Sequence, residues 1–168
     1  NPAFSRAEDV ELAYRLAARG LHFVFSPLGI GYHYEHRTFA TWLSIPYDYG
    51  RFDVKMTYES DQAWLLPTIL AEFRGRPRFV QWITRACLDR PLRRQWATIT
   101  FRHLAALGNW RPTSLMGRAA CSSLFNLYHY QGIADALGGR ARFFDLSAAA
   151  ASANSEPSRP RRSGSSGG

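Results

Sequence analysis

A change in hydrophobic periodicity, about a third of the way along the 168 residues, constrains the fold more than any other feature of the sequence. Before it, helix-like and strand-like segments alternate; from about Gln62 onward the apolar residues recur only at helical spacing. Alternation is typical of α/β domains, whereas consecutive helices are typical of a helical bundle or extension. The sequence therefore predicts an α/β part followed by a mainly α-helical part.

Residues 10–19 are predicted to form an amphipathic helix. Ser5 and Glu8 fit a Ser-x-x-Glu capping box at its start, and Gly20 supplies the stop. Acidic residues crowd the first turn and arginines the last, as the helix dipole favours. The apolar face is expected to contain Val10, Ala13, Tyr14, Ala17 and Leu21.

Two short strands are predicted after this helix. Residues 22–25 are aromatic and β-branched, and Ser26 with Pro27 ends that run; residues 29–34 make a second extended piece. Residues 38–45 then have the apolar spacing of a short helix, which we expect to break at residues 47–51.

The remaining sequence is predicted to be helical as far as Gly138. Apolar stripes mark helices near residues 79–86 and 91–107, with Pro91 in a first turn, and a longer one over 114–137. One interpretation of these stripes is an internal apolar seam. The tryptophans expected in the core are Trp64, Trp82, Trp96 and Trp110.

The chain is expected to divide into three parts. Residues 1–55 form the end of an α/β domain, and residues 56–147 form the helical extension. Residues 148–168 consist almost entirely of Ala, Ser, Pro, Arg and Gly, which bury too little surface to offset the entropy of ordering. We expect this tail to be disordered.

Basic residues outnumber acidic ones, with 21 Lys and Arg against 13 Asp and Glu. This balance favours anionic partners such as phosphates, nucleic acid or acidic lipid. The arginines of residues 74–102 either face anionic lipid, with Trp82 and Trp96 at the interface, or form a solvated basic face over an apolar seam. Nucleic acid is not an expected partner, because no zinc-finger spacing, ribonucleoprotein aromatic motif or basic zipper occurs.

The cysteines and the apolar runs bear on the compartment. Cys87 and Cys121 lie far apart without metal-ligand spacing, which is typical of a reduced, cytosolic chain. The longest apolar run, residues 63–70, contains Pro67 and is far shorter than the roughly 20 residues of a membrane span. We expect a cytoplasmic protein, with a peripheral contact at the inner face of the membrane as a further option.

An ordered set of residues in the first third of the chain resembles a known family. Glu8-Asp9 is followed by a helix ending in Arg15, Leu16 and Gly20, then by a strand-like run, Pro27 and His33. Tyr49-Gly50-Arg51 comes after the next helix, and Tyr128-His129-Tyr130-Gln131-Gly132 lies further on. This order resembles the C-terminal portion of the inverting, family-two glycosyltransferases with the GT-A fold.

The resemblance implies a function and a set of roles. The intact enzyme would transfer a sugar from a nucleoside-diphosphate sugar to a hydroxyl of a glycan or lipid-linked acceptor. Asp9 would be the general base and Glu8 would orient it or the acceptor. His33 would be a third ligand of a Mg²⁺ or Mn²⁺ ion that neutralises the departing diphosphate. No Asp-x-Asp occurs here to supply the other ligands, so the nucleotide-binding half is expected before Asn1 and this chain alone is expected to be inactive.

Other interpretations of the same residues remain open. Glu8 and Asp9 also suit helix capping and dipole compensation, and His33 also suits a hydrogen-bonded residue at a strand end. His36 is expected to be solvated, and Glu35 either assists the site or pairs with Arg37. The alternative function is a non-catalytic, basic helical module that binds a membrane surface or a protein partner.

Overall fold

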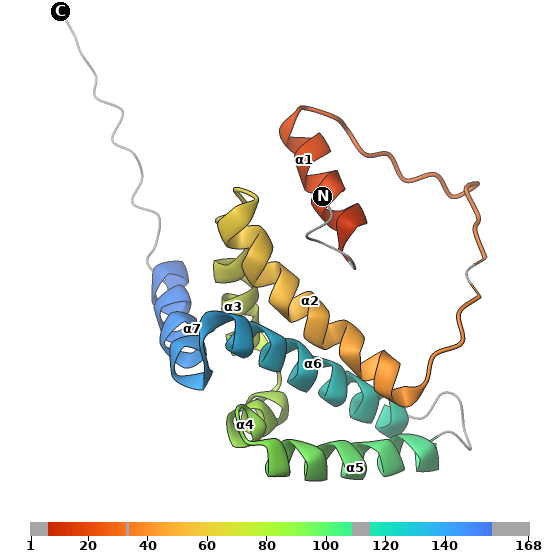
Figure 1. Cartoon of the computed structure of the whole chain (residues 1–168), viewed down its shortest axis with the longest axis vertical. Helices are drawn as coiled ribbons and strands as arrows, with labels where there is room; N and C mark the ends of the chain where they lie inside the picture. The colour runs from red at the N-terminus through yellow and green to blue at the C-terminus, as the bar shows by residue number, and fades with distance from the viewer. Residues whose placement is uncertain (1–6, 33, 109–114, 156–168) are drawn as a thin grey trace, which may run out of the picture.

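The structure, a computed structural model, describes residues 7–32, 34–108 and 115–155, and the regular secondary structure in these ranges is all α-helix. The α/β prediction is therefore wrong, since these residues form seven helices and no strand. Figure 1 shows α2 and α6 side by side at the centre, with α5 along the far side of α6. The helices are α1 (Glu8–Ala18), α2 (Phe39–Glu59), α3 (Leu65–Gly75), α4 (Arg78–Cys87), α5 (Pro91–Gly108), α6 (Leu115–Leu137) and α7 (Arg140–Ser155).

The two predicted strands are instead an exposed, extended connection between α1 and α2 (Figure 1). The residues described between 21 and 38 are all exposed, including Phe25, Leu28 and Tyr34. A strand is stable only when its N–H and C=O groups pair with a neighbouring strand, and the described part of the chain offers no such neighbour. The composition of residues 22–25 and 29–34 favours a strand, but composition alone does not form one.

Helix α1 ends as predicted and begins differently. The N–H of Gly20 donates to the carbonyl of Ala17, the N–H of Leu21 donates to that of Leu16, and Gly20 has a φ of 82°. This is a Schellman stop, and it requires a positive φ that glycine adopts without strain. The predicted capping box is wrong: the N-cap is Ala7, with no side-chain hydrogen bond, and Ser5 lies outside the described residues.

The buried face of α1 also differs from the predicted one. Val10 and Leu21 are exposed, whereas the carboxylate of Glu11 is buried and accepts from Arg15 Nε at 2.8 Å. Ala7 and Tyr14 pack near Met56 and Leu65, and the ring centroids of Tyr14 and Trp64 lie 5.7 Å apart at nearly a right angle. Hydrophobic spacing identified the helix but not the face that packs.

Helix α2 runs without interruption through the predicted break at residues 47–51 and through the predicted domain boundary at residue 55. Its interior includes Pro46, which is fully buried, and Gly50. A proline inside a helix costs about 3 kcal/mol relative to alanine, so packing of α2 must offset this local preference.

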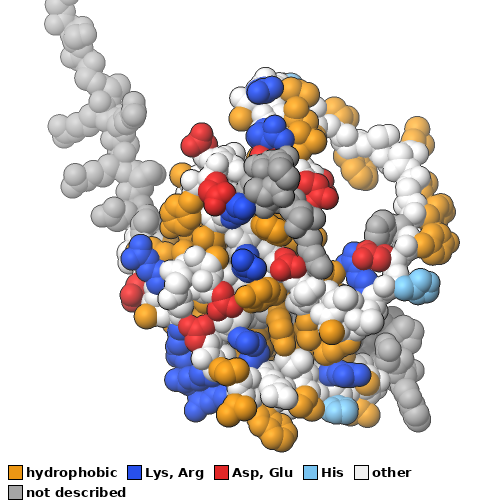
Figure 2. All heavy atoms as spheres, in the orientation of Figure 1, with side chains coloured by type: hydrophobic (Ala, Val, Ile, Leu, Met, Phe, Trp, Pro, Cys, Tyr) orange, Lys and Arg blue, Asp and Glu red, His pale blue; other side chains and the backbone are white. Residues whose placement is uncertain are grey.

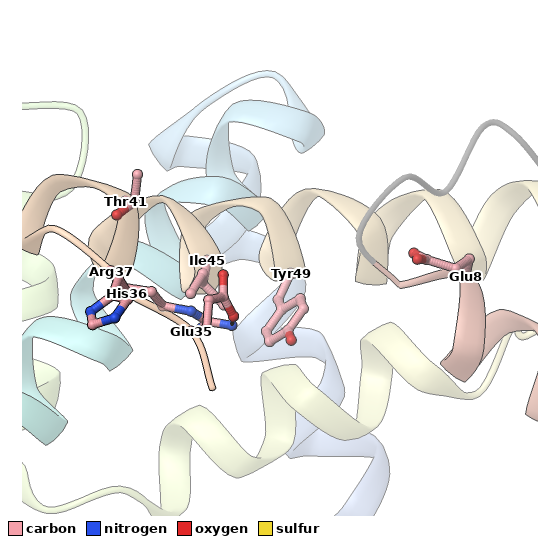
Figure 3. A pocket seen from close by; sticks show the side chains of 7 residues that line it. All are labelled: Glu8, Glu35, His36, Arg37, Thr41, Ile45 and Tyr49. Atoms are coloured by element: carbon pink, nitrogen blue, oxygen red, sulfur yellow. Dashed lines mark hydrogen bonds and ion pairs between the residues drawn. The ribbon is translucent and has the colours of Figure 1, made fainter. Parts of the chain in front are cut away.

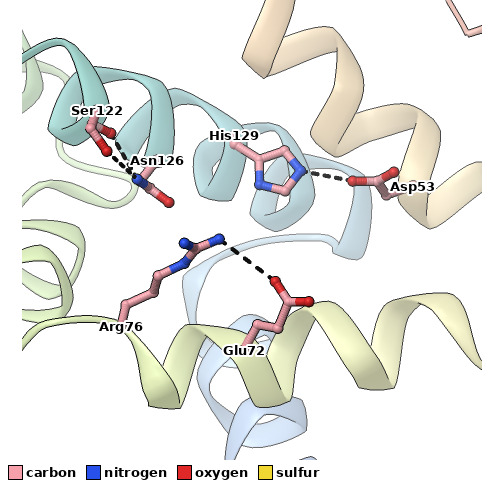
Figure 4. Close-up of polar contacts among 6 residues, drawn as sticks. All are labelled: Asp53, Glu72, Arg76, Ser122, Asn126 and His129. Carbon is pink, nitrogen blue, oxygen red and sulfur yellow. Dashed lines mark hydrogen bonds and ion pairs between the residues drawn. The ribbon is translucent and has the colours of Figure 1, made fainter. Parts of the chain in front are cut away.

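The two central helices touch backbone to backbone where Gly50 of α2 meets Gly132 of α6. A Cβ built on Gly50 would lie 2.1 Å from the carbonyl oxygen of His129, and one on Gly132 would lie 2.0 Å from that of Tyr47. Beside this contact, His129 Nε2 lies 2.7 Å from the Asp53 carboxylate (Figure 4). Both glycines are therefore packing requirements of the bundle.

The main core lies between α3, α6 and α7. Phe73 is fully buried, and its ring centroid lies 5.0 Å from that of Tyr130 and 5.3 Å from that of Phe143. Smaller apolar side chains complete this core cluster: Val54, Leu66, Leu70, Leu88, Ile133 and Ala134. These three ring contacts hold α3 and α6 against the C-terminal helix, α7.

Helices α4, α5 and α6 confirm the predicted segments, but only part of the predicted seam is internal. On α4, Ile83 and Ala86 pack in one cluster with residues of α6, whereas Phe79 and Trp82 are exposed. Phe101 of α5 is buried against α6, together with Ala97, Leu104 and Ala105. The residues of the predicted stripe on α5 face the other way: Leu92, Trp96, Ile99 and Leu107 are exposed. Trp64 and Trp82 are exposed as well, so none of these three tryptophans belongs to the core; Trp110 lies outside the described residues.

The C-terminal helix begins at once after α6. Gly138 and Gly139 both have positive φ and end α6, as the sequence predicted, with Gly139 N–H donating to the Ala134 carbonyl at 2.7 Å. The Asp89 carboxylate then accepts from the Arg140 backbone N–H at the start of α7 and from Gln131 Nε2. Helix α7 continues to Ser155, so residues 148–155 of the predicted tail are helical. Residues 156–168 lie outside the described part.

The two cysteines differ in burial, which gives a first prediction. Burial raises the pKa of the Cys87 thiol, partly opposed by Arg93, Arg94 and Arg90, whereas Cys121 is exposed. Since the thiolate is the reactive form, iodoacetamide at mildly alkaline pH should label Cys121 rapidly and Cys87 only as the fold opens. Mass spectrometry of timed samples tests this, with urea-unfolded protein as the control. Equal labelling rates in the native state would contradict the packing of α4.

Candidate functional site

One polar hollow, of about 400 Å³, brings predicted site residues together with residues the sequence did not single out. It is bounded by the head of α1, the end of the extended connection and one face of α2 (Figure 3). Its lining residues are Glu8, Glu35, His36, Arg37, Thr41, Ile45 and Tyr49.

The α2 side of the hollow follows from helix geometry. Thr41, Ile45 and Tyr49 are four residues apart, so they share one face of α2, as Figure 3 shows. Thr38 caps the helix, because its Oγ1 accepts from the Thr41 N–H at 3.1 Å. This cap fixes the point at which the extended connection enters α2, directly after Arg37.

Charged groups gather where the connection approaches α2. Arg37 forms an ion pair with Glu35, and this hydrogen bond raises the pKa of Arg37. The pairing confirms one of the two predictions for Glu35. His36 is exposed, as predicted, but also lines the hollow. An acid, an imidazole and a guanidinium therefore follow one another along a single edge.

One of the two predicted catalytic acids, Glu8, lies at the opposite end of the hollow. Glu8, the first residue of α1, lines it across from His36 and Arg37 (Figure 3). Packing of Ala7 and Tyr14 near Met56 and Leu65 sets this position. Asp9 is exposed, and its carboxylate Oδ1 accepts from the Val10 N–H at 2.8 Å. Of the two acids, Glu8 is the one among the lining residues.

The predicted metal ligand, His33, lies outside the described residues. Those that are described bring no three His, Cys, Asp or Glu side chains together as ligands. The described residues thus do not form the expected Mg²⁺ or Mn²⁺ site by themselves. The resemblance assigns its other ligands to an Asp-x-Asp segment that is not in this sequence.

A second, larger groove of about 840 Å³ runs between α2 and the end of α6. Tyr47 borders it, and its hydroxyl donates to Asp135 Oδ2 at 2.8 Å. Burial and this hydrogen bond raise the pKa of Tyr47. None of Glu8, Asp9 and His36 lines this groove. We therefore regard the smaller hollow as the candidate site.

Sequence reasoning did not find the Asp53–His129 pair, because the two residues lie 76 positions apart in the chain and no local spacing could have paired them. It named Arg37 only as a partner of Glu35, and it expected His36 to be solvated rather than to line a site. No helix in the described ranges is both long and apolar enough to cross a membrane.

The hollow is open and polar, so it suits a hydroxyl-bearing or anionic molecule better than an apolar one. The carboxylate of Glu8 lies at one end and that of Glu35 at the other. The His36 imidazole, the Arg37 guanidinium and the Tyr49 phenol also line it. Comparison with family models, with curated proteins and with solved structures finds no match to this chain.

Proposed function

We propose that this chain is the acceptor-side portion of an inverting sugar transferase and that the polar hollow receives the acceptor. One observation carries the proposal: Glu8 and Tyr49, two residues of the family-like ordered set, line the same hollow although they are far apart in sequence. Helix capping accounts for acids at the head of α1. It does not account for an acid that lines the same hollow as Tyr49, Arg37 and His36.

The resemblance assigns the proton to Asp9, which directly follows Glu8 but does not itself line the hollow. The acceptor hydroxyl gives its proton to the Asp9 carboxylate while its oxygen bonds to the anomeric carbon of the donor sugar. The bond from that carbon to the phosphate oxygen breaks, the nucleoside diphosphate leaves with the electron pair, and the configuration inverts. Glu8 orients the acceptor in the hollow, and Arg37 offers a fork of donors to its hydroxyls or to an anionic group.

Several parts of this proposal rest on the resemblance. The donor is a nucleoside-diphosphate sugar, bound by sequence outside these residues, and the acceptor is a glycan or lipid-linked hydroxyl. A Mg²⁺ or Mn²⁺ ion, with His33 as one ligand, would supply Lewis-acid stabilisation of the diphosphate. The protein would act in the cytoplasm, peripherally at the inner face of the membrane.

The test is sugar transfer by the polypeptide as its source organism produces it. Release of nucleoside diphosphate from UDP-glucose, UDP-N-acetylglucosamine and GDP-mannose would be measured with a lipid extract as the acceptor source. Asp9→Asn should lower kcat/KM by roughly 10²–10⁴-fold, the usual contribution of a positioned base. Glu8→Gln should mainly raise KM for the acceptor, because it removes an orienting contact.

Asp145→Asn on α7 is the matched control, since it neutralises an exposed carboxylate that does not line the hollow. It should leave the kinetic constants unchanged, and all three variants should keep the helical circular dichroism of the parent. Full activity in Asp9→Asn would overturn the assignment of the base. Absence of transfer from every donor would instead favour the non-catalytic helical module.

A further inference from the structure

Helix α5 is apolar on two opposite faces, and only one of them is covered. The covered face, around Phe101, packs on α6. On the other face, the exposed fractions are 73% for Leu92, 71% for Trp96 and 69% for Leu107. With Ile99 and the exposed His103, these residues recur every three or four positions, so they form one stripe that is apolar except at His103, hereafter the α5 stripe. Figure 2 shows hydrophobic side chains along the edge of the molecule where α5 lies in Figure 1.

Exposed arginines lie on α5 and on its neighbour α4, where Arg85 and Arg102 also lie over the rings of Phe73 and Phe39. Residues 78–108 contain one acid, Asp89, and its carboxylate is already bonded to Gln131 and to the backbone of Arg140. Within the described residues, the exposed arginines of α4, α5 and their junction form no ion pair with an acid. The exposed arginines of α4, α5 and their junction are Arg78, Arg85, Arg90, Arg93 and Arg102.

This combination identifies the chemistry of the partner. A helix with Trp and Leu on one face and cations at its margins suits the boundary between lipid headgroups and acyl chains. Unpaired arginines add attraction to anionic lipid, and tryptophan favours the interface itself. A single-stranded nucleic acid would need several aromatic platforms, whereas the α5 stripe is mainly aliphatic. A second copy of the chain would place like-charged margins against each other.

We propose that the α5 stripe docks this protein on an anionic bilayer surface, with α5 lying parallel to the membrane plane. Trp96 and Leu92 enter the boundary below the headgroups, while Arg93 and Arg90 bind lipid phosphates. The covered face of α5 remains on α6, so docking requires no change of fold. This inference does not depend on sugar transfer, since it concerns a surface remote in sequence from Glu8 and Asp9.

The experiment is sedimentation of the full chain with sucrose-loaded vesicles. Vesicles of phosphatidylcholine mixed with phosphatidylglycerol should bind the protein, and added salt should weaken this binding; vesicles of phosphatidylcholine alone should not bind it. Reversing one charge at the surface removes about 2 kcal/mol of attraction, so Arg93→Glu should weaken partitioning by roughly thirtyfold. Trp96→Glu should weaken it at least as much.

Two matched controls separate docking from general effects of charge and polarity. Leu28→Glu changes a leucine that is 91% exposed in the extended connection, and Arg142→Glu reverses an exposed charge on α7. Both should bind like the parent. A spectroscopic readout uses lipids brominated on their acyl chains, which quench nearby tryptophan. The quenching should fall in Trp96→Phe, a variant that keeps an aromatic surface.

Three results would overturn the proposal: equal binding to neutral vesicles, equal losses in the controls, or a dimer in sedimentation equilibrium that only Trp96→Glu dissociates. The last would assign the α5 stripe to a second copy. Asp9→Asn should bind vesicles like the parent. Loss of sugar transfer with vesicle binding intact, or the reverse, would therefore identify which of the two proposals fails.

Discussion

Replacing Gly132 by alanine should prevent the central pair of helices from packing. The added Cβ would lie 2.0 Å from the Tyr47 carbonyl oxygen, 2.9 Å from its carbon and 3.2 Å from the Arg51 nitrogen. All three are backbone atoms, so no side chain can rotate away and α2 must move as a whole. Ordinary overpacking costs about 1–3 kcal/mol, and a backbone clash at the centre of the bundle should exceed this.

The expected loss of stability is opposite to the usual effect of this substitution in a helix. In an exposed helix interior, Gly→Ala stabilises by up to about 1 kcal/mol, because alanine is the better helix former. Gly75→Ala on α3 is the control, since nothing lies within 4 Å of its added Cβ. Urea unfolding followed by circular dichroism should show a large fall in the unfolding midpoint for Gly132→Ala and for Gly50→Ala. The midpoint should not fall for Gly75→Ala. Similar midpoints for all three would disprove the close crossing.

Phe73→Ala should be the most destabilising substitution in the main core. The change removes a fully buried ring that contacts the rings of Tyr130 and Phe143 on two other helices. Phenylalanine truncations of this kind cost about 3–5 kcal/mol, a large share of a typical domain's total stability. The melting temperature should fall by on the order of 10 °C.

Phe25→Ala provides the comparison for this core substitution. Phe25 is almost fully exposed in the connection between α1 and α2, so its truncation should change stability by less than about 0.5 kcal/mol. Thermal melts monitored by circular dichroism distinguish the two variants directly. If Phe25→Ala were as harmful as Phe73→Ala, the connection would have to be packed rather than exposed.

Helices α4, α5 and α6 could be predicted because their signals are local. Apolar spacing defines α4, α5 and α6, Pro91 begins one of them, and Gly138 ends another. Helix stops of this kind depend on only a few neighbouring residues, so they survive in any tertiary setting. The stop at Gly20 was predictable for the same reason.

Apart from the N-cap of α1 and the helical residues 148–155, the errors concern interactions between distant parts of the chain. Residues 22–25 have strand composition, but a strand also needs a partner that composition cannot reveal. Gly50 and Pro46 read locally as helix breakers, whereas α2 tolerates both within its packed interior. Periodicity found the stripe of Trp96 but could not tell which of two apolar faces of α5 would be buried.

The candidate site was predictable only in part. Glu8 could be singled out from its place at a helix head, and His36 and Glu35 from their chemistry. Their meeting depends on the extended connection, which carries the chain away from α1 and back to the start of α2 (Figure 1). No local pattern encodes that return, so Thr41, Ile45 and Tyr49 could not be assigned to the hollow in advance.

The contact between α2 and α6 also sets an order of events during synthesis. The Tyr47 hydroxyl and the Asp135 carboxylate that accepts from it are 88 residues apart, so α2 leaves the ribosome long before its partner exists. At about 5–20 residues per second, that interval lasts several seconds. Throughout it the face of α2 that α6 later covers, from Leu43 to Val54, has no α6 to pack against.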